Sequence, residues 1–259
     1  MALVDSGIGL LAAAAAVRRA RPDAHLVLSG DPDGMPWGPR TPADLSAHAL
    51  ACARATVAHR PDALIVACNT ATVHALDALR AELEPAVPVI GTVPAIKPAA
   101  AAGGPVAVWA TPATTGSAYQ RGLIAEFAGG AQVTEVPCPG LAEAVEHADE
   151  AAVRAAVSAA AARTPSDVRA LVLGCTHYEL VAGQIRAAVQ PAGAPPIAFH
   201  GSADAVAAQA LRRIGLAPDP GAQHTGGLTV IHSGRPAHLP EEALAYVEGR
   251  SLAAACLPG

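Results

Sequence analysis

The sequence contains few aromatic residues and no long hydrophobic run. Aromatic residues make up 3% of the 259 residues, whereas hydrophobic residues make up 52%. Alanine supplies much of the apolar content, and alanine-rich runs favour helices. No stretch reaches the roughly 18–20 consecutive apolar residues that a membrane-spanning helix needs, so we expect no membrane span. The first residues lack a basic segment followed by a long apolar core, and we therefore expect no export signal.

Clusters of positive charge are missing as well. The net charge is −5, and Lys97 is the only lysine. Proteins that bind nucleic acid carry a basic patch, so we expect no nucleic-acid partner. The mild negative charge would not steer an acidic substrate, which local groups would have to recognise.

The cysteines do not form a CxxC pair or a cluster with the spacing of zinc ligands, so we expect no metal site. An odd number of cysteines without an export signal is typical of free thiols in a reducing compartment, which favours a cytoplasmic location. Any one of them, taken alone, could be a small buried hydrophobic residue. The five are Cys52, Cys68, Cys138, Cys175 and Cys256.

Short apolar runs alternate with alanine-rich helical stretches, a pattern typical of a parallel α/β fold. Proline and glycine mark the joins between them. The expected strands are 3–4, 25–28, 63–67, 89–90, 106–109, 133–136, 170–173, 197–199 and 228–231. The expected helices include 11–20, 41–59, 73–84, 117–127, 150–163 and 179–189.

Two segments of the chain repeat each other. ALIVACNTAT at 63–72 resembles ALVLGCTHYE at 170–179. Each is an apolar strand followed by a small residue, a cysteine and polar residues that open a helix. The repetition predicts two similar α/β halves, each with a cysteine at the carboxyl end of a strand, where open α/β sheets bind ligands. Turns of this kind also recur by chance in α/β proteins, so the alternative stays open.

The two cysteine turns carry groups suited to proton transfer and to anion binding. A thiol at the start of a helix lies near backbone N–H groups that favour its thiolate form. The polar residues that follow are Asn69 and Thr70 after Cys68, and Thr176 and His177 after Cys175. Their amide, hydroxyl and imidazole groups could hold a carboxylate or tune a thiol. The alternative is a structural cysteine, with Thr70 as a helix cap.

A turn with a carboxylate follows the first expected strand. Asp5 and Ser6 precede two glycines, but the spacing is not that of a dinucleotide-binding loop and no Walker lysine follows, so we do not expect nucleotide binding. Asp5 could accept a substrate ammonium or orient a thiol. The alternative is a simple helix cap.

Two more turns offer pocket and anion-binding groups. Trp37, between Pro36 and Gly38, could wall a pocket and donate its indole N–H, or lie on the surface. The hydroxyls after strand 106–109 could bind a carboxylate at a helix start or merely cap that helix. They belong to Thr111, Thr114, Thr115 and Ser117.

Together these segments resemble the glutamate racemase branch of the aspartate/glutamate racemase superfamily. The match runs in order through VDSGIG (4–9), PWG (36–38), ACNTAT (67–72), ATPATTGSAYQRGL (110–123), CPGLAEAVE (138–146), LVLGCTHYEL (171–180) and HSGRP (232–236) with ALAYVEG (243–249). The resemblance implies two α/β domains with mostly parallel sheets, related by a pseudo-twofold axis, with the active site in the cleft between them. The domains would be 1–94 plus 206–259, and 95–205.

The resemblance also implies roles for individual residues. Cys68 and Cys175 match the two acid/base cysteines, Asp5 and His177 match residues that assist them, and Glu146 matches the acid after the family's CP motif. The expected substrate-binding residues are Ser6, Pro36, Trp37, Gly38, Asn69, Thr70, Thr111, Thr114 and Thr176. Trp37 stands where the family usually has tyrosine, and Leu10 where a second glycine is common. Both departures bear on which amino acid is the substrate more than on the type of reaction.

The activity that the resemblance implies is racemisation of glutamate. One cysteine, as thiolate, would remove the α-proton while the other, as thiol, protonates the opposite face. This scheme needs no cofactor, and Lys97 beside prolines is no convincing anchor for pyridoxal phosphate. D-glutamate would supply peptidoglycan, and a homodimer is expected. The alternatives are a racemase for aspartate or another amino acid in specialised metabolism, and a non-catalytic amino-acid-binding protein.

Overall fold

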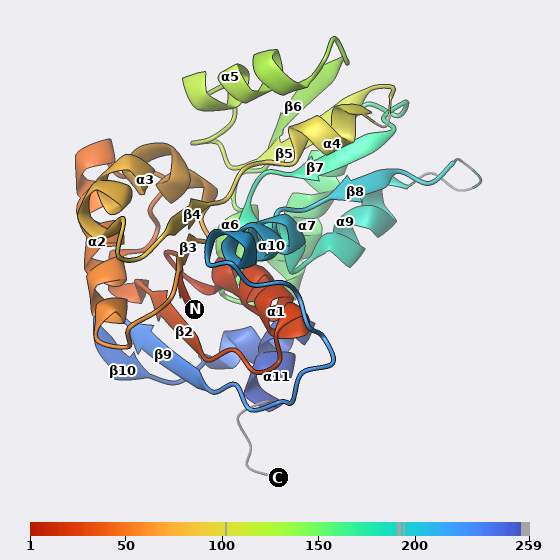
Figure 1. Ribbon diagram of the computed structural model, residues 1–259. Helices are drawn as coiled ribbons and strands as arrows, with labels where there is room; N and C mark the ends of the chain where they lie inside the picture. Colours follow the sequence, from red (N-terminus) through yellow and green to blue (C-terminus); the bar gives the residue numbers. More distant parts are fainter. Residues whose placement is uncertain (102, 191–192, 194, 255–259) are drawn as a thin grey trace. The chain divides into compact units, whose positions relative to one another are not determined.

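The computed structural model describes residues 1–101, 103–190, 193 and 195–254, and Cys256 lies outside them. The chain divides into two compact units, Met1–Thr92 with Ala203–Gly259, and Val93–Ser202. Each unit contains one β-sheet with helices packed around it (Figure 1). The expected α/β fold with mostly parallel sheets is confirmed.

The first unit is built on a six-stranded sheet in the order β10-β9-β2-β1-β3-β4. Neighbouring strands are parallel except β10, which is antiparallel to β9. The strands are β1 (Ala2–Val4), β2 (Leu26–Gly30), β3 (Leu64–Val66), β4 (Val89–Gly91), β9 (Leu228–His232) and β10 (Arg235–Ala237). The helices are α1 (Leu11–Ala20), α2 (Pro42–Val57), α3 (Asn69–Leu83), α10 (Ala203–Arg213) and α11 (Val247–Ala254), with 3-10 turns η1 (Ile8–Leu10), η2 (Pro32–Gly34) and η3 (Glu241–Ala245).

The second unit is built on a four-stranded parallel sheet in the order β6-β5-β7-β8. The strands are β5 (Val106–Ala110), β6 (Val133–Pro137), β7 (Ala170–Leu173) and β8 (Ala198–His200). The helices are α4 (Ile96–Ala101), α5 (Ala118–Phe127), α6 (Leu141–Glu146), α7 (Glu150–Ala161), α8 (Thr176–Glu179) and α9 (Ala182–Val189). Trp109 of β5 is fully buried, and its indole N–H donates to Thr164 Oγ1 at 2.9 Å.

The two sheets share one strand order. The four strands β2-β1-β3-β4 of the first unit correspond, in their order along the chain, to β6-β5-β7-β8 of the second. Cys68 lies two residues after β3, and Cys175 lies two residues after its counterpart β7. The repetition seen in the sequence therefore reflects a repeated topology.

Local sequence explains most of these elements. The central strands β1, β3, β5 and β7 are unbroken apolar runs because helices cover both faces of a parallel sheet. Helix α2 begins with Thr41, whose side chain accepts the Asp44 N–H, followed by Pro42 in the first helical position. Helix α7 begins with Asp149, which accepts two backbone N–H groups at 3.0 Å.

The boundaries of two expected helices were wrong. The helix expected at 73–84 begins at Asn69, because Cys68 rather than Thr70 occupies the N-cap position. The helix expected at 179–189 begins at Ala182, because Thr176–Glu179 forms a separate short helix and Val181 leaves the helical conformation. Strand β10 was missed, since three residues including a proline carry little strand signal.

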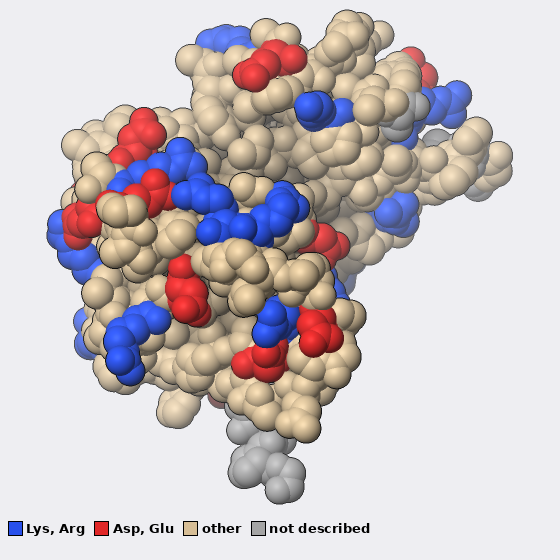
Figure 2. Space-filling view, in the orientation of Figure 1, with Lys and Arg blue, Asp and Glu red and all other residues tan. Residues whose placement is uncertain are grey.

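Charged side chains of both signs lie on the surface. Figure 2 shows basic side chains with acidic ones nearby. Ion pairs join Arg54 with Glu82 and Arg213 with Glu84. Among the residues that the structure describes, no helix combines the length and the apolar character needed to cross a membrane.

One buried cation ties helix α1 to the segment before β9. The Arg18 guanidinium is buried and donates to four carbonyl oxygens at 2.8–3.0 Å. These belong to Pro22, Ala24, Gly226 and Gly227. Glycine is required at 226, because a Cβ there would meet the guanidinium and the Ala24 carbonyl.

We expect Arg18→Met to lower the free energy of unfolding by about 2–4 kcal/mol, since the four carbonyls lose a charged donor. Arg19→Met is the matched control, because Arg19 forms only an exposed pair with Asp204 and should contribute less than about 1 kcal/mol. Urea unfolding followed by circular dichroism measures both values. Equal losses in the two variants would contradict the structural role of Arg18.

Candidate functional site

The first candidate site lies where the strand order of the first unit reverses. From β1 the chain continues to β2 on one side, and from β3 it continues to β4 on the other. In open parallel sheets this switch point leaves a crevice at the carboxyl ends of the two adjacent strands, where ligands bind. Asp5 directly follows β1, and Cys68 follows β3. The Ala67 N–H donates to the Val4 carbonyl at 2.8 Å, which continues the pairing up to the cysteine.

Cys68 occupies the N-cap position of α3 with an extended backbone, φ −143° and ψ 120°. The residue is 8% exposed. Asn69 is buried in the first turn, and Thr70 beside it is half-buried. The backbone N–H groups of a helix start carry partial positive charge, which favours an anion at this position.

Asp5 is fully buried next to Ser6. Its Oδ1 accepts the Ser6 backbone N–H at 2.7 Å and lies 3.4 Å from the Ser6 hydroxyl, which can donate to it. The Ser6 carbonyl in turn accepts the Asp31 N–H at 3.0 Å. The turn that carries Asp5 is therefore joined to the next strand–loop connection of the same unit.

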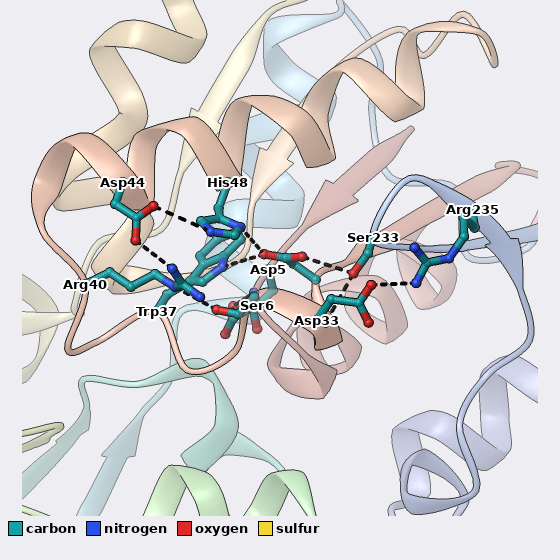
Figure 3. A network of polar contacts seen from close by, with 11 residues as sticks. Asp5, Ser6, Asp33, Trp37, Arg40, Asp44, His48, Ser233 and Arg235 are labelled. Atoms are coloured by element: carbon teal, nitrogen blue, oxygen red, sulfur yellow. Dashed lines mark hydrogen bonds and ion pairs between the residues drawn. The ribbon is translucent and has the colours of Figure 1, made fainter.

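Trp37 lies in the core of the first unit and not on its surface. It is 2% exposed and belongs to the same buried cluster as Cys68. Its indole N–H donates to Asp31 Oδ2 at 3.0 Å, and His48 Nδ1 lies 2.7 Å from the same oxygen. The Ser233 hydroxyl donates to Asp31 Oδ1 at 3.0 Å. Figure 3 shows Trp37, His48 and Ser233 in this network of polar contacts.

The segment around Trp37 is thus held from several elements. Pro36 is exposed and Gly38 is half-buried on either side of the buried indole. Sequence reasoning missed Asp31 and His48, because their contacts join a loop to helix α2 and to residues more than 200 positions away. The polar run Asp31–Gly34 marked only a turn.

The second candidate site lies at the equivalent switch point of the second unit, between β5 and β7. The Gly174 N–H donates to the Trp109 carbonyl at 2.7 Å, as Ala67 does to Val4. A Cβ at Gly174 would lie 2.8 Å from that carbonyl oxygen, so the close approach requires glycine. Cys175 then takes the N-cap position of α8 and is 8% exposed.

A chain of polar contacts runs from the Cys175 thiol. Its Sγ lies 3.9 Å from His177 Nδ1, and His177 Nε2 lies 2.8 Å from Glu146 Oε2. The side chains of His177 and Glu146 are 8% and 13% exposed. Glu146 is the last residue of α6, so the contact joins two elements far apart in the sequence. In the neutral tautomer whose Nε2 donates to the Glu146 carboxylate, the Nδ1 lone pair is on the side of the thiol.

The hydroxyls that follow β5 divide into two groups. Ser117 caps α5 by accepting the Gln120 N–H, and the Thr115 hydroxyl donates to the Thr111 carbonyl. The capping interpretation therefore holds for Ser117. Thr111 Oγ1 instead donates to Oγ1 of Thr114, which is buried at the carboxyl end of β5.

The structure thus gathers the expected residues into two sets, each within its own unit. The first set is Asp5, Ser6, Pro36, Trp37, Gly38, Cys68, Asn69 and Thr70. The second set is Thr111, Thr114, Glu146, Cys175, Thr176 and His177. Among the described residues, no group of three or more His, Cys, Asp or Glu side chains could hold a metal ion.

Known proteins resemble this chain over most of its length. The family model described as Asp/Glu/Hydantoin racemase matches residues 9–214. A glutamate racemase from Roseiflexus sp. (strain RS-1) is 41% identical over 193 residues, which cover 71% of this chain and 70% of that protein. A glutamate racemase from Herpetosiphon aurantiacus is 33% identical over 244 residues, covering 92% and 93%.

A solved structure also matches. The crystal structure of Escherichia coli glutamate racemase, in complex with L-glutamate and the activator UDP-MurNAc-ala, superposes with a TM-score of 0.80 at 28% identity. The match covers 98% of this chain and 94% of that chain.

Two other described cysteines, Cys52 and Cys138, are buried in the core. Burial raises the pKa of the Cys52 thiol to about 12, and the nearby Asp31 adds to the effect. Burial likewise raises the pKa of Cys138 to about 12, and the Cys138 thiol donates to the Val136 carbonyl at 3.4 Å. Both thiols stay protonated at neutral pH and fill the core.

These pKa shifts make stability depend on pH above about 9. The unfolded thiols lose their protons near pH 9 while the folded ones hold theirs to about 12, so stability is complete below pH 9 and falls as pH rises. We expect a loss of about 1 kcal/mol per thiol between pH 9 and 10. Urea unfolding of the wild type and of a Cys52→Ala/Cys138→Ala variant checks this. Identical pH slopes would contradict it.

Proposed function

Since the chain belongs to the Asp/Glu/hydantoin racemase family and is an amino-acid isomerase of the glutamate racemase type, we propose that it interconverts L- and D-glutamate by two-base proton transfer. The reaction uses Cys68 and Cys175 and needs no cofactor. One observation carries the proposal. Each unit presents one cysteine after the third strand of the same strand order, at the switch point where open sheets bind ligands.

In this proposal the two thiols act from opposite sides of the α-carbon. The thiolate on one side removes the α-proton, and the thiol on the other side delivers a proton to the opposite face. The proposed domains are 1–94 plus 206–259, and 95–205. Each thiol must come within about 3–3.5 Å of the reacting carbon.

The groups beside each cysteine support separate parts of the reaction. His177, with Glu146 accepting its Nε2 proton, can take the proton from Cys175 and return it. Asp5 would assist Cys68 or receive the substrate ammonium. Amide and hydroxyl donors would stabilise charge on the substrate carboxylate, each contributing about 3–4 kcal/mol. These donors are Ser6, Asn69, Thr70, Thr111, Thr114 and Thr176. Pro36, Trp37 and Gly38 are further proposed substrate-binding residues.

The wider role follows from the product. D-glutamate would serve peptidoglycan synthesis, the location would be the cytoplasm and the assembly a homodimer. A racemase for aspartate or another amino acid is the rival substrate assignment, because Trp37 replaces the tyrosine usual in the family. A chiral-chromatography screen of all L- and D-amino acids, without added cofactor, separates these cases. A binding protein would instead bind an amino acid without changing its configuration.

We expect Cys68→Ser and Cys175→Ser each to lower kcat for racemisation by about 10²–10⁴-fold, since a hydroxyl is a far weaker acid than a thiol. The fold should be unchanged by circular dichroism. Cys52→Ser is the matched control and should keep near wild-type turnover, because Cys52 is a core thiol. Wild-type rates in either switch-point variant would remove the assignment.

We also expect solvent deuterium to enter the α-position during turnover, because the thiols exchange their protons with water. Proton NMR of glutamate in D2O measures the loss of the α-proton signal, and circular dichroism follows configuration in the same sample. The product enantiomer should carry deuterium from its first appearance. Racemisation with full retention of the α-proton would contradict proton delivery from an exchangeable thiol.

A further inference from the structure

The chain passes from one unit to the other at two places, after Thr92 and after Ser202. At the first crossing, the Thr92 N–H donates to Thr72 Oγ1 at 3.1 Å, and the two threonine hydroxyls lie 3.2 Å apart. Thr72 and Thr92 are 5% and 1% exposed. A buried polar contact within the first unit therefore fixes the end of the segment that leaves it.

The second crossing is fixed in the same manner within the second unit. Ser202 donates both its backbone N–H and its hydroxyl to Glu179 Oε1, each at 2.8 Å. Ser202 is 4% exposed. Hydrogen bonds to a carboxylate are stronger than those between neutral groups, so this contact is the firmer of the two.

The residues that hold the crossings occupy equivalent positions next to the two cysteines. Thr72 lies four residues after Cys68 on α3, and the Thr72 N–H donates to the Cys68 carbonyl at 2.9 Å. Glu179 lies four residues after Cys175 and is the last residue of the short helix α8. In each unit, one helical turn therefore separates the cysteine from the residue whose side chain accepts the N–H of the crossing residue.

Glycine precedes the crossing residue in both units. A Cβ at Gly91, before Thr92, would lie 2.7 Å from Thr72 Cγ2. A Cβ at Gly201, before Ser202, would collide with the Glu179 carboxylate. The close approach between each crossing and its cysteine-bearing helix therefore depends on a missing side chain, and this arrangement occurs twice in the repeated topology.

We propose that Thr72 and Glu179 are positioning residues, each of which couples the cysteine-bearing helix of its unit to the chain crossing that leads to the other unit. The inference rests on the proposed two-cysteine function. Each contact fixes the cysteine-bearing helix of its own unit to the residue at which the chain leaves that unit. A displacement of about 1 Å can slow a reaction about 10²-fold, so a modest loosening is measurable.

The test uses full-length Thr72→Val and Glu179→Gln, with glutamate deuterated at C2 in either enantiomer. In a two-base reaction, loosening one cysteine raises only the barrier at which that cysteine transfers a proton. We expect the isotope effect on kcat/KM in Thr72→Val to increase for one enantiomer and to fall toward 1 for the other. Glu179→Gln should show the opposite asymmetry, and both variants should lose about 10–100-fold in kcat.

Matched controls separate positioning from general destabilisation. Thr56→Val removes a buried hydroxyl that donates to the Ala53 carbonyl, and Glu84→Gln alters a carboxylate that accepts the Val89 N–H. Both should keep the wild-type isotope effects. Thr72→Ser retains the hydroxyl oxygen that accepts the Thr92 N–H. Its isotope effects for the two enantiomers should therefore match those of the wild type. If Thr72→Val does not fold, Ser202→Ala removes the hydroxyl that donates to Glu179 and tests the second crossing.

Two results would overturn the inference. Wild-type isotope effects in both Thr72→Val and Glu179→Gln, or equal shifts for the two enantiomers, would show that the contacts do not position the thiols. A wild-type enzyme that neither racemises glutamate nor exchanges its α-proton would instead overturn the proposed function, and this inference with it.

Discussion

Two backbone hydrogen bonds set the positions of the two cysteines on which the candidate sites depend. The Ala67 N–H meets the Val4 carbonyl at 2.8 Å, and the Gly174 N–H meets the Trp109 carbonyl at 2.7 Å. Each bond extends the pairing of two parallel strands by one residue beyond the sheet, at the switch point of the strand order. The following residue is then a cysteine at the start of a helix. Its position is therefore set by the strand pairing of the sheet.

The repeat is one of topology and not of side chains. Cys175 is accompanied by an imidazole that a carboxylate holds, whereas the switch point that carries Cys68 has the buried carboxylate of Asp5, held by the Ser6 N–H. A racemase must treat two mirror-image substrates with groups that are not mirror images. Similar backbones with different neighbouring side chains are one solution, because the acid and base strength of each thiol can then be set separately.

Local sequence was sufficient for every described strand except β10 and insufficient for long-range contacts. The expected strand at 63–67 contains β3, because a buried parallel strand is an unbroken apolar run that any window reveals. The start of α3 was placed four residues late, since a cysteine is not a typical helix cap. The contacts of Asp31 with Trp37, His48 and Ser233 had no local signal. The roles of the site residues stay predictions, because they concern a substrate and not the folded chain.

The two tryptophans of the sequence fall one to each unit, Trp37 at 2% exposure and Trp109 at 0%. Both indoles are buried and hydrogen-bonded. The Trp37 N–H donates to Asp31, and the Trp109 N–H donates to Thr164. Their fluorescence therefore gives each half of the molecule its own native optical reporter. Replacing either indole by phenylalanine would leave an emission signal from a single half, so that melting of the two halves could be followed separately without attaching a dye.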